Sequence, residues 1–171
     1  MKKSSLLNIF FCPCCIGKTT LSNTDNNFID LDQSIFREKE NSTLKIKNYF
    51  VYLANIAVYL AEQGYNVLLV MNPATMNELS SRNIKYYSIF LDPSLSHMIE
   101  NRFDARKSSD FVNNRSLEYL KNKTEEVLYN FDNIYNDINH DTPDLAYKIT
   151  DENYNLKEII YKMKENQNAK N

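Results

Sequence analysis

The sequence predicts an α/β fold in which a central parallel sheet of about five strands carries helices on both faces, as three layers. Short apolar segments alternate along the chain with segments of helical periodicity, which is typical of a parallel sheet with crossover helices. The first apolar segment also leads through a short loop at residues 12–19 into a helix. Strand, loop, helix and second strand within about thirty residues have the size of a βαβ unit.

Continuous apolar runs predict buried strands, because strands covered on both faces lack alternation. Most of these runs stop abruptly at a proline or an acidic residue, which ends the strand. Such runs predict strands at residues 6–11, 66–71 and 86–91, and two further short strands are predicted at residues 28–32 and 146–150.

Apolar residues at three- and four-residue spacing predict the helices between these strands. The longest regular pattern runs through residues 43–63 and is followed by Gly64, the residue expected just past a helix end. The other predicted helices begin at residue 18 or cover residues 76–81, 94–106, 110–131 and 156–165. Residues 166–171 are polar and are expected to form a frayed tail.

The chain has 171 residues, which predicts a single domain over residues 1–165. A hydrophobic content of 43% with 25% charged residues excludes wholesale disorder. The formal net charge of −2 gives no nucleic-acid signal. No apolar run reaches the ~18 residues of a membrane helix, so no membrane association is expected.

All three cysteines lie within residues 12–15, so no disulfide framework can span the fold. The amino-terminal segment loosely imitates a signal peptide, but Asn8 interrupts its apolar run and no small-residue cleavage site precedes Cys12. We therefore expect a reducing compartment and a cytoplasmic protein.

Residues 12–19 occupy the frame G-x-x-x-x-G-K-[ST] at every defined position except the first, where Cys12 replaces glycine. In this frame backbone N–H groups wrap a phosphate, Lys18 reaches the outer phosphates and the Thr19 hydroxyl binds Mg²⁺. Gly17 is expected because a Cβ there would crowd the anion. The predicted nucleotide-binding residues are Cys12, Pro13, Cys14, Cys15, Ile16, Gly17, Lys18, Thr19 and Thr20.

The second predicted strand ends in two carboxylates, Asp30 and Asp32, at the edge where ligands bind in α/β sheets. Asp30 is expected to bind the metal, and Asp32 to orient or deprotonate an acceptor hydroxyl. The alternative for Asp32 is a helix N-cap. Arg102 and Arg106 lie four residues apart on one predicted helix face, where cations could stabilise a transferring phosphate. The alternative for this pair is a solvated helix face.

The cysteines admit two other interpretations: small residues packed beneath the phosphates, or a zinc or redox site. Zinc needs four ligands, and the only histidines, His97 and His140, are remote from the cluster in sequence. We expect both histidines to lie on the surface or to have their ring nitrogens hydrogen-bonded within the fold. Thiols beside a helix N-terminus are also expected to gain thiolate character.

Three segments, C-P-C-C-I-G-K-T-T, F-I-D-L-D-Q-S-I and N-R-F-D-A-R, resemble the P-loop small-molecule kinases of the nucleoside monophosphate kinase group. The resemblance is closer to the small nucleotide-kinase-like proteins of bacteriophages and low-GC bacteria, and D-L-D-Q is also similar to shikimate kinase and dephospho-coenzyme A kinase. It implies a P-loop NTPase fold, ATP and Mg²⁺ at the loop, and an arginine-bearing helical lid at residues 94–131. The chain departs from this pattern at Cys12, at Asn72-Pro73-Ala74 after the third strand, and in lacking lid glycines.

The expected function is an ATP- and Mg²⁺-dependent transfer of a phosphoryl group to a small acceptor, a (deoxy)nucleoside monophosphate first among them. The catalytic residues would be Lys18, Asp32, Arg102 and Arg106, and the metal ligands Thr19 and Asp30. One alternative is a degenerate P-loop protein that acts through a macromolecular partner. Another is a thiol switch built on the cysteines.

Overall fold

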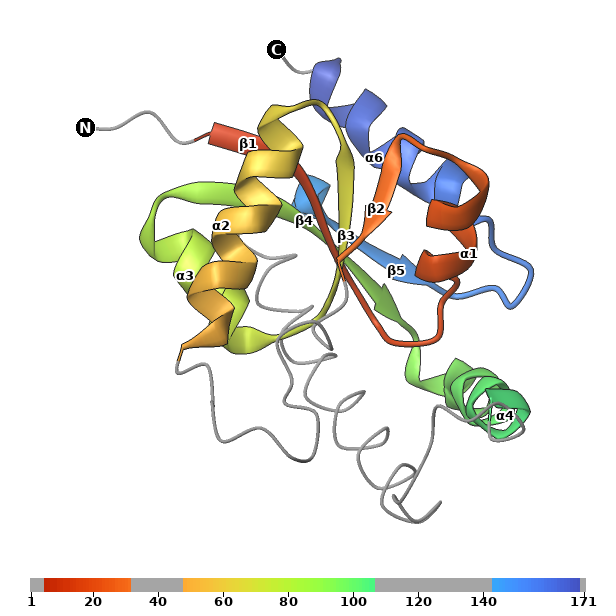
Figure 1. The fold of residues 1–171 in the computed structure, drawn as a ribbon. Coiled ribbons are helices and arrows are strands. Elements are labelled where there is room, and N and C mark those ends of the chain that lie inside the picture. The colour runs from red at the N-terminus through yellow and green to blue at the C-terminus, as the bar shows by residue number, and fades with distance from the viewer. Residues whose placement is uncertain (1–4, 32–47, 107–142, 170–171) are drawn as a thin grey trace, which may run out of the picture. The chain divides into compact units, whose positions relative to one another are not determined.

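A computed structural model of the chain describes residues 5–31, 48–106 and 143–169 (Figure 1). These residues divide into two compact units, one formed by Met1–Cys12 with Lys18–Tyr87 and the other by Pro13–Gly17 with Ser88–Asn171. Predictions for residues 107–142 lie outside the described residues, including the helix at 110–131, most of the lid, and His140. Asp32 lies outside them as well.

The strands form one five-stranded sheet in the order β2-β3-β1-β4-β5. The pairs β1 with β3, β2 with β3, and β4 with β5 are all parallel, so the predicted α/β fold with a parallel sheet is confirmed. The strands are β1 (Ser5–Cys12), β2 (Phe28–Asp30), β3 (Asn66–Val70), β4 (Ile84–Leu91) and β5 (Ala146–Ile149).

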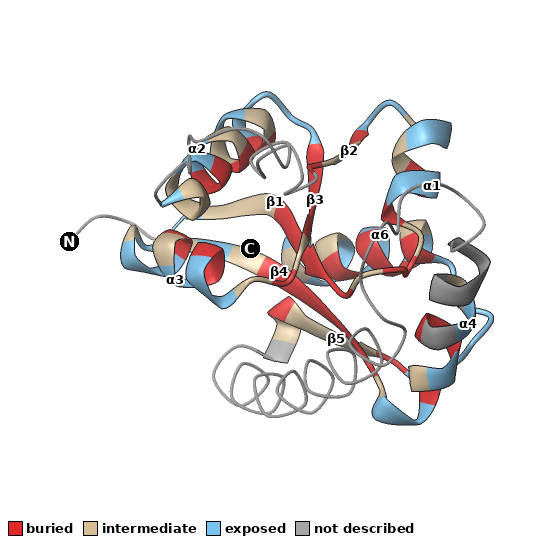
Figure 2. Cartoon of the chain, turned by 60° about the horizontal axis from the view of Figure 1, so that its bottom comes forward, coloured by how far each residue is buried: buried red, intermediate tan, exposed pale blue. Residues whose placement is uncertain are grey.

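In the first unit, β1 and β3 form the buried centre, with Ile9 opposite Val67 and Cys12 opposite Val70 (Figure 2). Aromatic rings connect β1 to the first half of β4, because Phe10 stacks on Tyr87 with ring centroids 4.7 Å apart. The second half of β1, Ile9–Cys12, is fully buried, which agrees with the continuous apolar run that predicts this strand.

The helices of this unit are α1 (Lys18–Thr24), α2 (Tyr49–Glu62) and α3 (Pro73–Ser81). The connection from β1 through α1 passes β3 to reach β2, and the connection through α2 returns to β3. Because crossovers between parallel strands are right-handed, these opposite directions put α1 and α2 on opposite faces of the strands. Helices therefore cover both faces in this unit, and α3 packs beside α2 (Figure 1).

Helix α2 begins at Tyr49, so the helix predicted over residues 43–63 is interrupted at Asn48, and its first residues, 43–47, lie outside the described residues. Asn48 has a left-handed backbone with φ 61°, which asparagine tolerates and a helix cannot contain. At the other end Gly64 adopts φ +94°, Gly64 N–H donates to Ala61 O and Tyr65 N–H donates to Leu60 O. This is a Schellman C-cap, so the predicted role of Gly64 is confirmed.

In the second unit, the second half of β4 pairs with β5, and the helical segments are η2 (Pro93–Leu95), α4 (Ser96–Arg106), η3 (Pro143–Leu145) and α6 (Leu156–Asn168). Asn155 caps α6 by accepting hydrogen bonds from the backbone N–H groups of Lys157 and Glu158. The helix buries Leu156, Ile159, Ile160 and Met163 along one face. It ends at Asn168, three residues beyond its predicted end. Residues 166–168, expected in a frayed tail, are therefore helical.

None of the helices in the described part of the chain has both the length and the apolar character needed to cross a membrane.

Candidate functional site

The loop that carries the predicted phosphate site starts at Cys12, the last residue of β1. Cys12 keeps the extended backbone of a strand, and its carbonyl accepts a 3.0 Å hydrogen bond from Met71 N–H. Its side chain is fully buried, with Sγ 3.7 Å from Phe10 O. The first position of the frame therefore has no conformational requirement for glycine here, because a side chain fits the strand geometry.

Glycine is required at the other end of the loop for a backbone reason. Gly17 has φ +97°, a conformation that residues with a Cβ rarely adopt, and a Cβ built on it meets no atom within 4 Å. The reason for this glycine in the described structure is therefore its left-handed backbone. Cys15 also has a positive φ of 60°, so the loop turns twice in the left-handed region within three residues.

Lys18 and Thr19 begin α1, immediately after this turn. Thr19 Oγ1 donates a 2.6 Å hydrogen bond to Oδ2 of Asp30, the last residue of β2. Lys18 is only 6% exposed, although ammonium groups are seldom buried. The first unit therefore brings together two of the predicted metal and phosphate ligands, Thr19 and Asp30, from separate elements.

The charges of Lys18 and Asp30 both act on the Cys12 thiol. Burial raises the pKa of Cys12 to about 12, the Lys18 ammonium partly opposes this rise, and the Asp30 carboxylate adds to it. Cys12 is therefore a neutral thiol at physiological pH, and the expected thiolate character is wrong for this cysteine. The same effects indicate that a cation and a carboxylate flank the end of β1.

The Thr19 and Asp30 oxygens fit a magnesium ion by their spacing. Octahedral Mg²⁺ has ligands at about 2.1 Å, so adjacent ligand oxygens lie about 3.0 Å apart. The Thr19 and Asp30 oxygens are 2.6 Å apart and would need only a small outward movement. Magnesium in phosphate sites keeps several waters and uses one or two protein oxygens plus phosphate oxygens. A single carboxylate with a hydroxyl is therefore a sufficient donor set.

In the second unit, Arg102 contacts the loop backbone. Its Nη1 donates 2.7 Å hydrogen bonds to Cys15 O and to the Tyr154 hydroxyl. The Tyr154 hydroxyl in turn donates to Ile16 O at 2.9 Å, and the guanidinium lies 5.6 Å from the centre of the Tyr154 ring. Arg102 and Tyr154 are both half-buried. We call this pair the loop clamp.

For the remaining predicted site residues the structure gives a position in the fold. Arg106 is the last residue of α4, one helical turn beyond Arg102. Thr20 is exposed on α1. Pro13 is buried and Cys14 is half-buried within the loop. A contact of either arginine with a transferring phosphate remains a prediction.

The carboxyl end of β3 carries no charged group at Asn72-Pro73-Ala74. Asn72 instead caps α3, where its Oδ1 accepts from Ala74 N–H at 2.9 Å and from Thr75 N–H. Its Nδ2 donates to the Tyr49 hydroxyl at 2.8 Å. Both ends of the Asn72 amide therefore form hydrogen bonds within the fold.

His97 bonds through Nδ1 to Ser94 O at 3.1 Å and through Nε2 to Glu152 at 2.7 Å. Both ring nitrogens of this surface histidine therefore have hydrogen-bond partners, as expected. None of the three cysteines at positions 12, 14 and 15 forms a disulfide. Within residues 5–31, 48–106 and 143–169, no group of three or more His, Cys, Asp or Glu side chains could hold a metal ion.

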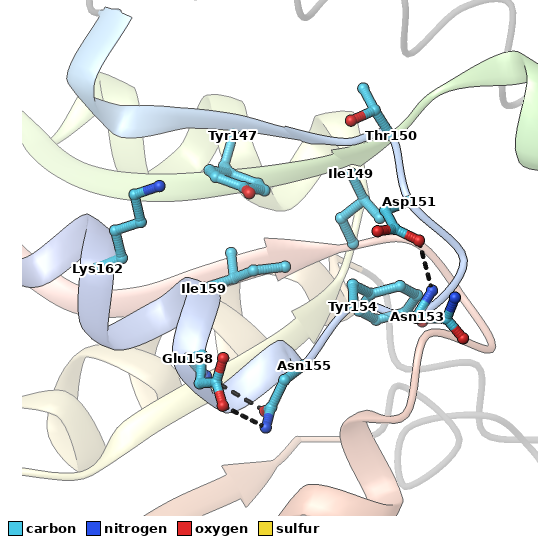
Figure 3. A pocket seen from close by; sticks show the side chains of 10 residues that line it. All are labelled: Tyr147, Ile149, Thr150, Asp151, Asn153, Tyr154, Asn155, Glu158, Ile159 and Lys162. Carbon is cyan, nitrogen blue, oxygen red and sulfur yellow. Dashed lines mark hydrogen bonds between the residues drawn. The ribbon is translucent and has the colours of Figure 1, made fainter.

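A pocket of about 540 Å³ lies in the second unit between β5 and α6 (Figure 3). Tyr147 and Lys162 line one end, and Asp151 and Tyr154 line the other (Figure 3). Because the Tyr154 hydroxyl bonds the loop, this pocket shares a side chain with the predicted phosphate site.

Tyr154 is not among the residues that the sequence predicts for the site. One signal pointed to it: Tyr154 follows β5 by five residues, and the carboxyl ends of parallel strands meet at one edge of a sheet. Comparisons with models of protein families and with curated proteins found no match to this chain.

Proposed function

We propose that the chain is an ATP- and Mg²⁺-dependent phosphotransferase whose nucleotide phosphates bind at residues 12–19. The hydrogen bond between Thr19 and Asp30 supports this most directly, because it brings a hydroxyl and a carboxylate together directly after the loop. The spacing of Gly17, Lys18 and Thr19 in the phosphate-loop frame is the second support. A P-loop NTPase fold is part of this proposal.

Each residue would have a separate task in binding. The Ile16 and Gly17 N–H groups would donate to phosphate oxygens, and the Lys18 ammonium would bind the outer phosphates. Thr19 and Asp30 would hold Mg²⁺, which neutralises charge on the phosphates when bound. Catalysis would then depend on positioning and on charge stabilisation, as is usual for phosphoryl transfer.

The acceptor is proposed to be a small molecule with a free hydroxyl or phosphate, with a (deoxy)nucleoside monophosphate tested first. Transfer would move the terminal phosphoryl group of ATP to an acceptor oxygen, release ADP, and pass the acceptor proton to a base. Asp32 keeps its predicted role as that base. Arg106 keeps its predicted role near the transferring group.

The proposal is tested by calorimetric titration of the full chain with ATP·Mg²⁺, followed by a product assay with a panel of nucleoside monophosphates and shikimate. The informative variant is Lys18→Met, which keeps an apolar stem in the buried site and removes the charge. It should keep the wild-type melting temperature within a few degrees and lose turnover. Wild-type binding without any product would favour the degenerate P-loop alternative. No binding at millimolar ATP·Mg²⁺ would overturn the proposal.

A further inference from the structure

The loop clamp binds two successive carbonyl groups of the phosphate loop. Arg102 Nη1 bonds Cys15 O at 2.7 Å, and Tyr154 Oη bonds Ile16 O at 2.9 Å. These residues lie 87 and 138 positions further along the chain than the carbonyls they bind. The clamp therefore holds the loop by tertiary contacts, which the loop's own sequence does not supply.

Fixing these two carbonyls also fixes two amides. A peptide group is planar and trans, so its N–H points opposite to its C=O. The Cys15 carbonyl shares a peptide plane with Ile16 N–H, and the Ile16 carbonyl shares one with Gly17 N–H. Both N–H groups must therefore point away from Arg102 and Tyr154. Successive amides turned the same way form the concave anion site that phosphate loops use.

The hydrogen bonds within the clamp have a fixed direction. Arg102 can only donate, so the Tyr154 oxygen accepts from it. The single hydroxyl proton of Tyr154 is then available for Ile16 O. The guanidinium lies 5.6 Å from the centre of the same tyrosine ring, which adds a cation–π attraction. Loss of either side chain would therefore weaken the hold on both carbonyls.

We propose that Arg102 and Tyr154 are positioning residues that orient the Ile16 and Gly17 N–H groups for phosphate binding, without themselves contacting the phosphate. This inference rests on the proposed function, since it assigns the loop a phosphate ligand. It also gives Arg102 a different role from the transition-state contact expected for a lid arginine.

The test compares Tyr154→Phe and Arg102→Lys with a control, Tyr59→Phe, which removes the hydroxyl of an exposed tyrosine on α2. Dissociation constants for ATP·Mg²⁺ and for tripolyphosphate·Mg²⁺ are measured by calorimetry well below the melting temperature of each variant. We expect each clamp variant to raise the dissociation constants of both ligands about tenfold, which is the effect of one lost hydrogen bond in a polar network. The double variant should lose much less than a hundredfold in affinity, because both residues hold the same loop and their effects are not additive.

Each other outcome overturns the inference in a different way. Unchanged affinities with a lowered melting temperature would make the clamp a purely structural feature. Weaker ATP binding with unchanged tripolyphosphate binding would mean that Tyr154 contacts the nucleoside through the adjoining pocket. Failure of the wild-type chain to bind either ligand would overturn the proposed function, and this inference with it.

Discussion

The hydroxyl of Thr19 donates a 2.6 Å hydrogen bond to Oδ2 of Asp30, and this bond joins the start of α1 to the end of β2. Neither residue needs this partner for the local fold, because α1 has its own backbone hydrogen bonds and β2 pairs with β3. In the proposed function these two oxygens would hold a divalent cation beside the phosphates. The predictions below test this pair and the loop that precedes it.

Asp30→Asn should weaken ATP binding at least about tenfold in the presence of Mg²⁺, since loss of a metal-supporting carboxylate costs that much or more. Binding of ATP in excess EDTA should change little, because the loop amides and Lys18 are untouched. Calorimetric titration under both conditions measures the two constants.

Asp25→Asn is the matched control for this substitution. Asp25 lies between α1 and β2, and its Oδ1 accepts from Asn27 N–H at 2.9 Å, a role that asparagine can also fill. This variant should bind ATP·Mg²⁺ like the wild type. Equal losses from both substitutions would indicate a general effect of charge and would argue against a metal ligand.

Gly17→Ala should destabilise the protein by about 1–2 kcal/mol, the cost of a left-handed backbone at a residue with a Cβ. Gly64→Ala should cost about the same, because Gly64 has φ +94° and also has no atom within 4 Å of a built Cβ. Only Gly17→Ala should also weaken ATP binding, since only Gly17 lies in the loop. Urea denaturation and titration together separate the two effects, and a loss of ATP affinity in Gly64→Ala would contradict the assignment.

The sequence predicts the elements best where the local pattern and the tertiary environment agree. Apolar runs locate β1, β3 and β4, whose residues are largely buried, and the buried face of α6 follows the helical spacing. The predicted helix over residues 43–63 was not continuous, because Asn48 has a left-handed backbone that a helix cannot contain. Thr19 and Asp30 were predictable from their places after strands. The clamp was not, because Tyr154 and Ile16 meet only through the tertiary fold.

Cys14 should react first when the native protein is treated with iodoacetamide at neutral pH. Cys14 is half-buried, whereas Cys12 and Cys15 are 0% and 6% exposed. The raised pKa of Cys12 further removes its reactive thiolate form. Peptide mass spectrometry over a time course measures the order, and the urea-unfolded chain, in which all three should react, is the control. Bound ATP·Mg²⁺ should slow the labelling of Cys14. Rapid native labelling of Cys12 would contradict its burial.

The Cys12 thiol should make the protein lose stability above pH 9. Burial raises the pKa of Cys12 from 9.0 to about 12 in the folded state, so between these values the unfolded thiol ionises while the folded thiol stays protonated. Unfolding then releases a proton. This contribution to stability is complete below pH 9 and falls as the pH rises, by up to about 1.4 kcal/mol per pH unit.

The alkaline loss is measured by urea denaturation of the wild type and Cys12→Ala between pH 9 and 10. Over this interval Cys12→Ala should lose less stability than the wild type. The difference should reach at most about 1.4 kcal/mol per pH unit, the slope for one proton. Burial also raises the pKa of Tyr86 and Tyr87 above the ordinary value of 10, so these phenols add a similar loss only at higher pH. Tyr87→Phe should therefore match the wild-type slope below pH 10 and differ above it. Parallel stability curves for wild type and Cys12→Ala would mean that the thiol at the end of β1 is open to solvent.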